Sequence, residues 1–421
     1  MPMHGDGIRP GITTSNPPAR LLEMTRVLAL EGRRPSGVDR VCLAYLRAVL
    51  VDDAPCFGLV RTGLGYVLLD QQGMTACLEA IEGRRVWPEP DFISRLRHRV
   101  GSPRRVPDTM ARQVAIARAR PGKLGHMLRR HLPEGSVYLN VDQTTFTTRV
   151  AQAVKSIDGA KVTVFIHDTI PLDYPQYQTP QSVKKLSAIL KRCAKFADLI
   201  LTNSRVSAND ISRHMASLGP LPPVEVAHLG VEDDFFGTEN NAGQIMVPAP
   251  YFLCVGTIEP RKNIRFLLDL WEGMAASVLS GEPPRLVIAG RHGWESEEVL
   301  IHLESSPLRG KFLFEFNDLG DDELRSLMSG AAGLLFPSHA EGFGLPPVEA
   351  AAMGVPVVAN DLPVLREILG DYPIYASVSD VYLWETILRS LAAAAETGVG
   401  ANQRFSPPTW EAHFNSVLRV T

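Results

Sequence analysis

The chain has 421 residues, of which 45% are hydrophobic, and its formal net charge is −3. Because domains usually contain roughly 100–200 residues, this length and apolar content predict two domains with buried cores. The near-neutral charge gives no global reason to expect a nucleic-acid partner. The five cysteines are scattered without a C-x-x-C pair, which argues against a disulfide framework or a zinc site and favours a reducing cytoplasm.

The amino-terminal segment is polar and rich in Gly, Pro and Ser. We therefore expect a disordered tail at residues 1–19 rather than a signal peptide. No apolar run approaches the ~20 residues that a membrane-spanning helix needs. Any membrane contact is expected to be peripheral, at the inner face of the cytoplasmic membrane.

Residues 20–235 alternate loosely between apolar runs and helical stretches. The apolar runs are RLLEMTRVLAL, CFGLV, GYVLLD, SVYLNV, KVTVFIHD, ADLILTNS and VEVAHLGV. Such runs, with helical patterns between most of them, predict an α/β domain. We expect SGVDRV, residues 36–41, to form the turn after the first strand.

Residues 245–395 show the same alternation of apolar runs and helical patterns, but more regularly. The runs YFLCVGTI, RLVIAG, FLFEF, GLLFPS and VPVVAN read as strands, and helical patterns separate them. This rhythm predicts a second doubly wound α/β domain, with a parallel sheet covered by helices on both faces. The boundary is expected within residues 233–250, where Gly, Asn and Pro concentrate. Since ligands bind at the carboxyl ends of parallel strands, two facing domains predict an inter-domain cleft.

Residues 334–360, LLFPSHAEGFGLPPVEAAAMGVPVVAN, form the strongest pattern. They predict a strand, a glycine loop, a helix beginning near Pro346 and another strand. Gly342 and Gly344 allow the backbone to approach a ligand closely, and the start of the helix favours an anion such as phosphate. Glu341 and Glu349 flank that loop, and ionised carboxylates are suited to accept hydrogen bonds from hydroxyl pairs. A nucleotide-sugar supplies both the phosphates and the hydroxyl pairs.

Other interpretations of this pattern are weaker. Capping of the helix explains Glu349 alone, but not Glu341 with both glycines. The run GFG begins like a dinucleotide fingerprint, but Pro347 occupies the place of the third glycine. The sequence contains no G-x-x-x-x-G-K-[ST], H-E-x-x-H or G-x-S-x-G motif.

A second pattern is VGTIEPRKN, in which Arg261 and Lys262 follow a strand and Asn263 is a candidate helix cap. Cations at this position could stabilise the charge that develops on a departing diphosphate. The alternative is a pair of solvated charges in a loop. The proximity expected with the glutamate loop favours the functional interpretation.

The first half offers further candidates. His167 and Asp168 end a buried strand, where a histidine is either a satisfied core group or a cleft residue. Gly37 could approach the donor and Asp39 could hold an acceptor hydroxyl, although helix capping by Ser36 or Asp39 fits equally well. The acidic runs at 232–234 and 320–324 do not sit with other ligands, so we predict no metal site.

Residues 95–131 are strongly basic. The single acidic residue among them is Asp108. The cations are Arg95, Arg97, Arg99, Arg104, Arg105, Arg112, Arg118, Arg120, Lys123, Arg129 and Arg130. This segment could lie on an anionic membrane or hold a lipid acceptor linked through a diphosphate. The alternative is an ordinary solvated helical face. Nucleic acid is disfavoured because no aromatic pattern accompanies the charges.

In these motifs the sequence resembles family 4 of the retaining glycosyltransferases, which have the GT-B fold of two facing Rossmann-like domains. EGFGLPPVE carries the E-x7-E signature, with Glu341 and Glu349 in its two glutamate positions. The similarity is dense from about Tyr251 to Asn360 and thins in the first half to GVDRV, FIHDTIPL, LTNS and HLGV.

The resemblance implies a role for each matching residue. Glu349 would bind the ribose, Glu341 the donor sugar, and Arg261 and Lys262 the diphosphate. The remaining donor-binding residues would be Gly256, Gly342, Phe343, Gly344 and Leu345. His167 would lie beside the donor sugar, and the acceptor side would include Gly37, Asp39, Arg40 and Asp168. The resemblance also implies retention of anomeric configuration, no metal or other cofactor, and a helix within 396–421 that crosses back to the first domain.

Two departures qualify this resemblance. Many relatives have Gly-Arg where this chain has Gly256 and Thr257, so the diphosphate contact would depend on Arg261 and Lys262. The loop near Gly37 is less glycine-rich than usual and contains Asp39, which favours an acceptor role over a phosphate role.

The resulting functional hypothesis is transfer of a hexose, with mannose from GDP-mannose favoured, to a glycan or lipid-linked acceptor in surface polysaccharide biosynthesis. Three alternatives remain open. They are transfer from a UDP-sugar, a sugar-nucleotide epimerase or phosphorylase of the same fold, and a non-catalytic nucleotide-binding subunit. Loss of turnover in Glu341→Ala would separate an enzyme from a non-catalytic subunit.

Overall fold

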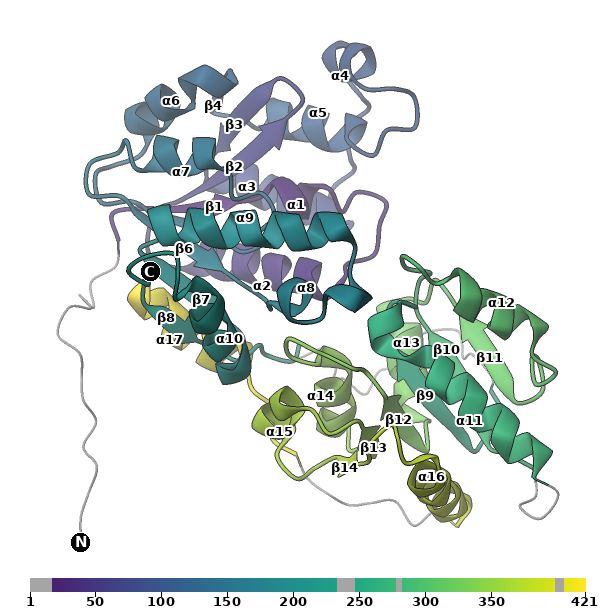
Figure 1. The fold of residues 1–421 in the computed structure, drawn as a ribbon. Coiled ribbons are helices and arrows are strands. Elements are labelled where there is room, and N and C mark those ends of the chain that lie inside the picture. Colours follow the sequence, from purple (N-terminus) through teal and green to yellow (C-terminus); the bar gives the residue numbers. More distant parts are fainter. Residues whose placement is uncertain (1–16, 233–246, 278–281, 398–404) are drawn as a thin grey trace, which may run out of the picture.

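The computed structural model describes residues 17–232, 247–277, 282–397 and 405–421. Most of the tail expected at 1–19 and of the boundary expected at 233–250 lies outside the described residues. The chain forms two α/β domains, each built around its own sheet (Figure 1). The prediction of two doubly wound domains is confirmed.

The amino-terminal domain contains an eight-stranded sheet with the order β4-β3-β2-β1-β5-β6-β7-β8 among the described residues. Its strands are β1 (Arg20–Glu23), β2 (Cys56–Thr62), β3 (Gly65–Leu69), β4 (Ala117–Ala119), β5 (Val137–Asn140), β6 (Lys161–Phe165), β7 (Leu199–Thr202) and β8 (Val224–Val226). Its helices are α1 (Thr25–Leu28), α2 (Gly37–Val51), α3 (Gln71–Ile81), α4 (Phe92–Arg97), α5 (Arg105–Gln113), α6 (Leu124–His131), α7 (Thr148–Val154), α8 (Ile170–Asp173), α9 (Pro180–Phe196) and α10 (Arg205–Met215), with short 3-10 turns η1 (Pro121–Lys123) and η2 (Pro175–Tyr177).

The first sheet departs from simple parallel winding at one edge. Strands β2 and β3 pair antiparallel, and so do β3 and β4. The neighbouring strands in the rest of the sheet, β2-β1-β5-β6-β7-β8, are all parallel. The cause is local, because only Gly63 and Leu64 separate β2 from β3, and so short a loop permits a hairpin but not a crossover.

The carboxyl-terminal domain contains a six-stranded sheet with the order β11-β10-β9-β12-β13-β14, and its described pairs are all parallel. The strands are β9 (Tyr251–Val255), β10 (Arg285–Ala289), β11 (Leu313–Phe316), β12 (Gly333–Phe336), β13 (Val357–Ala359) and β14 (Ile374–Tyr375). The helices are α11 (Ile264–Ala276), α12 (Glu297–Ser305), α13 (Asp321–Ser329), α14 (Leu345–Ala352), α15 (Pro363–Leu369) and α16 (Val381–Glu396), and η4 (Pro260–Lys262) precedes α11.

The last helix, α17 (Trp410–Val420), returns to the amino-terminal domain, where it lies beside β8 and α10 (Figure 1). His413 binds the hydroxyl of Tyr45 at 3.0 Å through Nε2 and the carbonyl oxygen of His228 at 3.0 Å through Nδ1. The buried guanidinium of Arg20 donates to the carbonyl oxygen of Leu418 at 2.9 Å. These contacts tie the end of the chain to the first strand.

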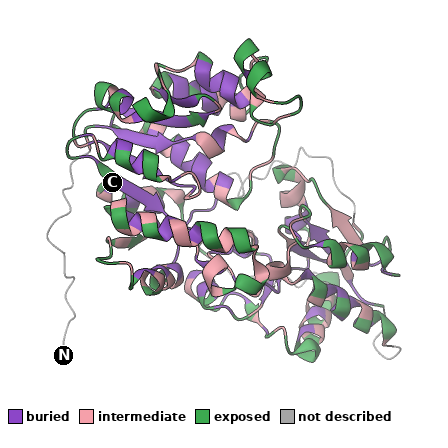
Figure 2. Cartoon of the chain, turned by 45° about the horizontal axis from the view of Figure 1, so that its top comes forward, coloured by how far each residue is buried: buried purple, intermediate pink, exposed green. Residues whose placement is uncertain are grey.

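The central strands of both sheets are largely buried, while exposed residues gather on the outer faces of the helices (Figure 2). The five cysteines are all free and buried. Within the described ranges, no helix is long and apolar enough to cross a membrane.

We expect Gly230 to be required for the docking of α17. A Cβ atom added there would lie 2.1 Å from the backbone nitrogen of Trp410, so Gly230→Ala must displace the start of the helix. Such overpacking typically costs about 1–3 kcal/mol of the free energy of unfolding, which urea denaturation measures. Gly122→Ala is the matched control, because nothing lies within 4 Å of its added Cβ. Equal stability of the two variants would contradict this account.

Candidate active site

A cavity of about 440 Å³ lies between the two domains and is lined by loops from both. Its walls come from the segment before α2 and the ends of β6 and β7 on one side. On the other side they come from the ends of β9, β10, β11 and β12. All of these strands end at the cavity, as expected for ligand sites in parallel α/β sheets.

The structure brings nearly all residues predicted from the sequence to this cavity. The predicted residues that line it are Gly37, Arg40, His167, Asp168, Gly256, Arg261, Lys262, Glu341, Gly342, Phe343, Gly344, Leu345 and Glu349. Asp39 is the exception, since it does not line the cavity.

Glu341 forms the centre of a compact ionic cluster. Its Oε1 lies 2.8 Å from Nη1 of Arg261 and 2.7 Å from Nζ of Lys262. Burial by itself would raise the pKa of Glu341, but the two cations outweigh burial and hold the pKa at about 2. The carboxylate is therefore ionised at neutral pH.

The cations of this cluster are held by several groups. Arg261 also pairs with Glu259 at 2.6 Å and donates to the carbonyl oxygen of Ala340 at 2.7 Å. Nζ of Lys262 lies 4.9 Å from the ring centroid of Phe336. Both cations are thus fixed in place by groups of the carboxyl-terminal domain itself.

Glu349 meets a residue from the opposite domain. It is buried in the first turns of α14, and its Oε1 lies 2.6 Å from Nη1 of Arg40 in α2. Arg40 was predicted on the acceptor side and Glu349 at the ribose. The structure joins these two side chains across the cleft.

The glycine loop before α14 is as tightly constrained as its sequence suggests. A Cβ on Gly342 would lie 2.8 Å from the carbonyl oxygen of His167 in the other domain. Gly344 has φ of +93° and occupies the cap position of α14, a conformation that favours glycine. This loop therefore lets the two domains approach each other closely.

His167 is buried, and its Nε2 lies 2.8 Å from the carbonyl oxygen of Val141. Since a carbonyl only accepts, Nε2 carries the hydrogen and Nδ1 has a free lone pair. Burial lowers the pKa of His167 to about 4, so the ring is neutral. The neighbouring Asp168 has a raised pKa because of burial, which Arg261 partly opposes.

The segment 36–41 differs from its predicted conformation as a turn after the first strand. The first strand ends at Glu23, the short helix α1 follows, and residues 37–41 form the beginning of α2. Ser36 and Asp39 form a capping box, and Asp39 also lies 2.6 Å from Nε of Arg26. These bonds occupy the carboxylate of Asp39. Of the two roles considered for Asp39, helix capping is therefore the one that the structure shows.

Asn263 differs from its predicted role as well. It precedes α11 but has φ of +54°, and its side chain makes no capping bond. Its Nδ2 donates instead to the carbonyl oxygen of Pro337 at 3.3 Å, next to the glutamate loop. Asn263 therefore links the segment of Arg261 and Lys262 to the strand that precedes the glutamate loop.

The cavity contains residues that the sequence analysis missed, namely Arg34, Asn203, Glu259, Arg291, Asn317 and Asp318. Asn317 and Asp318 follow directly after β11, so the rule that ligands bind at strand ends could have found them. Arg34 gave no such signal, because it precedes a helix whose position relative to the other domain depends on tertiary structure. Its Nε lies 3.4 Å from Asp318.

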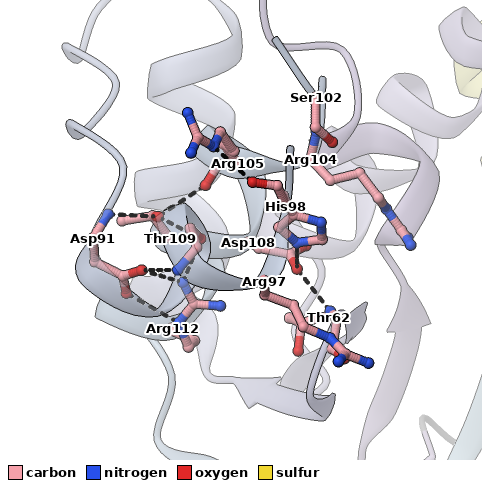
Figure 3. Close-up of polar contacts among 12 residues, drawn as sticks. Thr62, Asp91, Arg97, His98, Ser102, Arg104, Arg105, Asp108, Thr109 and Arg112 are labelled. Carbon is pink, nitrogen blue, oxygen red and sulfur yellow. Dashed lines mark hydrogen bonds and ion pairs between the residues drawn. The ribbon is translucent and has the colours of Figure 1, made fainter. Parts of the chain in front are cut away.

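The basic segment 95–131 is divided between structural and exposed arginines (Figure 3). Arg112 is buried and pairs with Asp91 at 2.6 Å, a carboxylate just outside the segment. Arg105 donates to the carbonyl oxygens of His98 and Arg95 at 3.2 and 3.1 Å. Part of this charge therefore holds the segment together, and contact of residues 95–131 with an anionic membrane or a lipid acceptor stays a prediction.

Further polar contacts join the two described domains. Glu367 of α15 accepts hydrogen bonds from the backbone N–H groups of Arg205 and Val206, at 2.6 and 3.0 Å. Nε2 of His228 lies 3.0 Å from the same carboxylate. The hydroxyl of Ser204 donates to the carbonyl oxygen of Gly342 at 3.1 Å. These bonds join the start of α10 and the loop after β8 to the carboxyl-terminal domain.

Residues 238–405 match the model of a protein family described as glycosyl transferases group 1. The chain is also 32% identical over 232 residues to the serotype-specific mannosyltransferase WbdA of Escherichia coli. The WbdA match covers 52% of this chain and 28% of WbdA, so the chain spans only about a quarter of that relative.

A second relative is the O-antigen chain mannosyltransferase B of Escherichia coli, to which the chain is 32% identical over 227 residues. That match covers 52% of this chain and 58% of the relative. The solved structure of Anabaena HepE in complex with UDP-glucose has a TM-score of 0.57 at 13% identity, covering 95% of this chain and 94% of HepE. Sucrose-phosphate synthase from Thermosynechococcus elongatus has a TM-score of 0.56 at 14% identity, covering 95% and 93%. The predicted GT-B fold is confirmed.

We expect the imidazole of His167 to stay neutral between about pH 5.5 and 8, because burial disfavours its charged form. Nuclear magnetic resonance of labelled histidine, with the signal assigned through His167→Gln, measures this directly. Its shifts should remain constant over that range, and a midpoint near the ordinary value of 6.5 would contradict the geometry.

The lowered pKa of His167 also makes the stability of the protein depend on pH. Because the folded pKa lies below the unfolded one, lowering the pH from 6.5 toward 4 reduces the free energy of unfolding.

Proposed function

We propose that this protein is a glycosyltransferase that moves a hexose from a nucleoside diphosphate sugar to a glycan or lipid-linked acceptor in surface polysaccharide biosynthesis. The observation that carries the proposal is the meeting of two carboxylates and two cations in one inter-domain cavity. Glu341 and Glu349 suit hydroxyl pairs, while Arg261 and Lys262 suit a diphosphate. The family match and the names of the mannosyltransferase relatives support it.

Each part of the donor has a matching group in the proposed site. The ionised carboxylate of Glu341 would accept hydrogen bonds from hydroxyls of the sugar, and Glu349 would do so from the ribose. The backbone N–H groups at the start of α14 would meet the diphosphate. Arg261 pairs with Glu341, and Arg40 pairs with Glu349. Donor binding would therefore exchange ion pairs inside the protein for contacts with hydroxyls and phosphates.

The proposed reaction retains the anomeric configuration and needs no metal. The bond between the anomeric carbon and the β-phosphate oxygen breaks, and the electron pair remains on the phosphate. The acceptor hydroxyl forms the new bond on the same face, and its proton passes to the leaving phosphate. Arg261 and Lys262 would stabilise the charge that develops on this phosphate more in the transition state than in the ground state.

Mannose from GDP-mannose is the donor that we propose first. The motifs HDTIPL and GTIEPRKN resemble those of mannosyltransferases. Two matching relatives are named as a serotype-specific mannosyltransferase and an O-antigen chain mannosyltransferase. We further propose that the protein works at the inner face of the cytoplasmic membrane, where a lipid-linked acceptor would be presented.

Transfer assays with GDP-mannose, UDP-glucose and UDP-galactose, with glycan and lipid-diphosphate acceptors, test this function. Lys262→Ala should reduce turnover by about 100-fold to 1000-fold, as when one preorganised donor to a developing oxyanion is lost. Lys311→Ala is the matched control, because Lys311 is an exposed cation of the same domain that pairs with Glu282. Thermal unfolding should be similar in both variants.

Acceptor-dependent release of the nucleoside diphosphate by the wild type, with wild-type turnover in Lys311→Ala, is the expected result. Unchanged turnover in Lys262→Ala would overturn the role of the cation. Conversion of the donor sugar without transfer to any acceptor would overturn the transferase in favour of an epimerase.

A further inference from the structure

A second cavity, of about 320 Å³, lies at the β2–β3 hairpin of the amino-terminal domain. Three arginines line it, Arg61 from the end of β2, Arg97 from α4 and Arg149 from α7. The rest of its wall comes from the hairpin and Pro121, and the described residues that line it include no carboxylate. This concentration of unopposed positive charge favours an anionic ligand.

The position of this arginine pocket follows from the sheet topology. Strand β2 runs parallel to β1, and β1 runs parallel to β5. Arg61 therefore lies at the carboxyl end of β2, and Arg149 lies in the helix that follows β5. His167 follows β6 at the same edge of this sheet. The pocket and the inter-domain cleft thus open from one edge of the acceptor-side domain.

None of the three guanidinium groups is neutralised within the described part of the chain. No carboxylate lies within ion-pair distance of Arg61, Arg97 or Arg149 there, although Nε of Arg97 donates to the carbonyl oxygen of Gly63 at 3.3 Å. Guanidinium groups bind phosphates through paired hydrogen bonds. Three such groups around one cavity are suited to a phosphate or diphosphate.

The pocket is built on a fixed support. The buried carboxylate of Asp108 accepts a hydrogen bond from the backbone N–H of Gly63 at 2.7 Å and lies 2.8 Å from Nε2 of His98 (Figure 3). Asp108 thereby joins the hairpin to the residue next to Arg97. The single acid of the basic segment positions the pocket instead of opposing its charge.

Exposed apolar side chains lie on two of the elements that form the pocket. Leu64 at the hairpin tip is exposed, and so are Phe92 and Leu96 of α4. Leu96 is 79% exposed, although burial of such a side chain would be favourable. Arginines next to exposed apolar side chains are typical of surfaces that contact anionic lipid.

We propose that the pocket of Arg61, Arg97 and Arg149 binds the phosphate group of a phosphorylated acceptor, and that the exposed side chains of α4 and the hairpin contact its lipid. This inference rests on the proposed function, because it makes the pocket an acceptor site. The pocket would hold the acceptor phosphate on the domain that carries His167, while the donor occupies the inter-domain cavity.

The double variant Arg61→Ala/Arg149→Ala tests the pocket, and Arg129→Ala/Arg130→Ala is the control. The control removes the same charge from exposed positions of α6 in the same domain. Calorimetric titration with inorganic pyrophosphate is performed in the presence of saturating GDP, so that the donor cavity is filled. Pyrophosphate should bind the wild type and the control, and bind the double variant at least tenfold more weakly.

Sedimentation with vesicles identifies the source of the phosphate. Vesicles of phosphatidylcholine with phosphatidylglycerol should sediment the wild type but not the double variant, whereas pure phosphatidylcholine should sediment neither. Pyrophosphate binding that depends on the pocket, with equal vesicle binding by all variants, would support a soluble phosphorylated acceptor and overturn the lipid contact.

Equal pyrophosphate binding by wild type and double variant would overturn the pocket itself, and so would its absence in the wild type. Binding of GDP alone distinguishes these failures from failure of the proposed function. The double variant should bind GDP like the wild type, because its changes lie outside the inter-domain cavity. Loss of GDP binding by every form would count against the donor site and leave the pyrophosphate result as a separate test of the pocket.

Discussion

The site depends on the bonds that Glu341 makes to Arg261 and Lys262. A buried carboxylate is stable as an anion only where cations or hydrogen bonds replace its water, and these two cations do so at 2.8 and 2.7 Å. The same bonds fix the cations after the carboxyl end of β9. Two motifs that are far apart in sequence are thereby held as one preorganised charged cluster.

The second constraint is the close approach of the two domains. Gly342 permits close contact with His167, and the carboxylate of Glu367 accepts hydrogen bonds from the backbone N–H groups at the start of α10. Across this contact between the domains, Arg40 pairs with Glu349, whose carboxylate we assign to the ribose. The ion pair links the occupancy of the donor site to the position of α2, because a ribose and Arg40 would compete for the same oxygens.

Much of this arrangement could be predicted from the sequence, and the reasons for success and failure are local. The carboxyl-terminal domain follows short-range rules, so its strands, the glycine loop and the start of α14 were predictable from Gly344 and the prolines after it. The hairpin after β2 was missed because only its two-residue loop, Gly63 and Leu64, indicates it. Residues 36–41 were expected as a turn, although Ser36 and Asp39 cap the start of a helix. The pairs Arg40 with Glu349 and Arg34 with Asp318 join residues about 300 positions apart, and no periodicity or spacing reports such contacts.

The most direct test of the central claim is calorimetric titration of the protein, without added metal, against GDP, UDP, ADP and TDP. We predict that one diphosphate binds selectively, that Glu349→Gln abolishes its binding, and that Arg40→Ala strengthens it by up to about fivefold because a competing ion pair is removed. Wild-type affinity in Glu349→Gln, or no binding of any diphosphate by the wild type, would contradict the assignment of the inter-domain cavity as a nucleotide-sugar site.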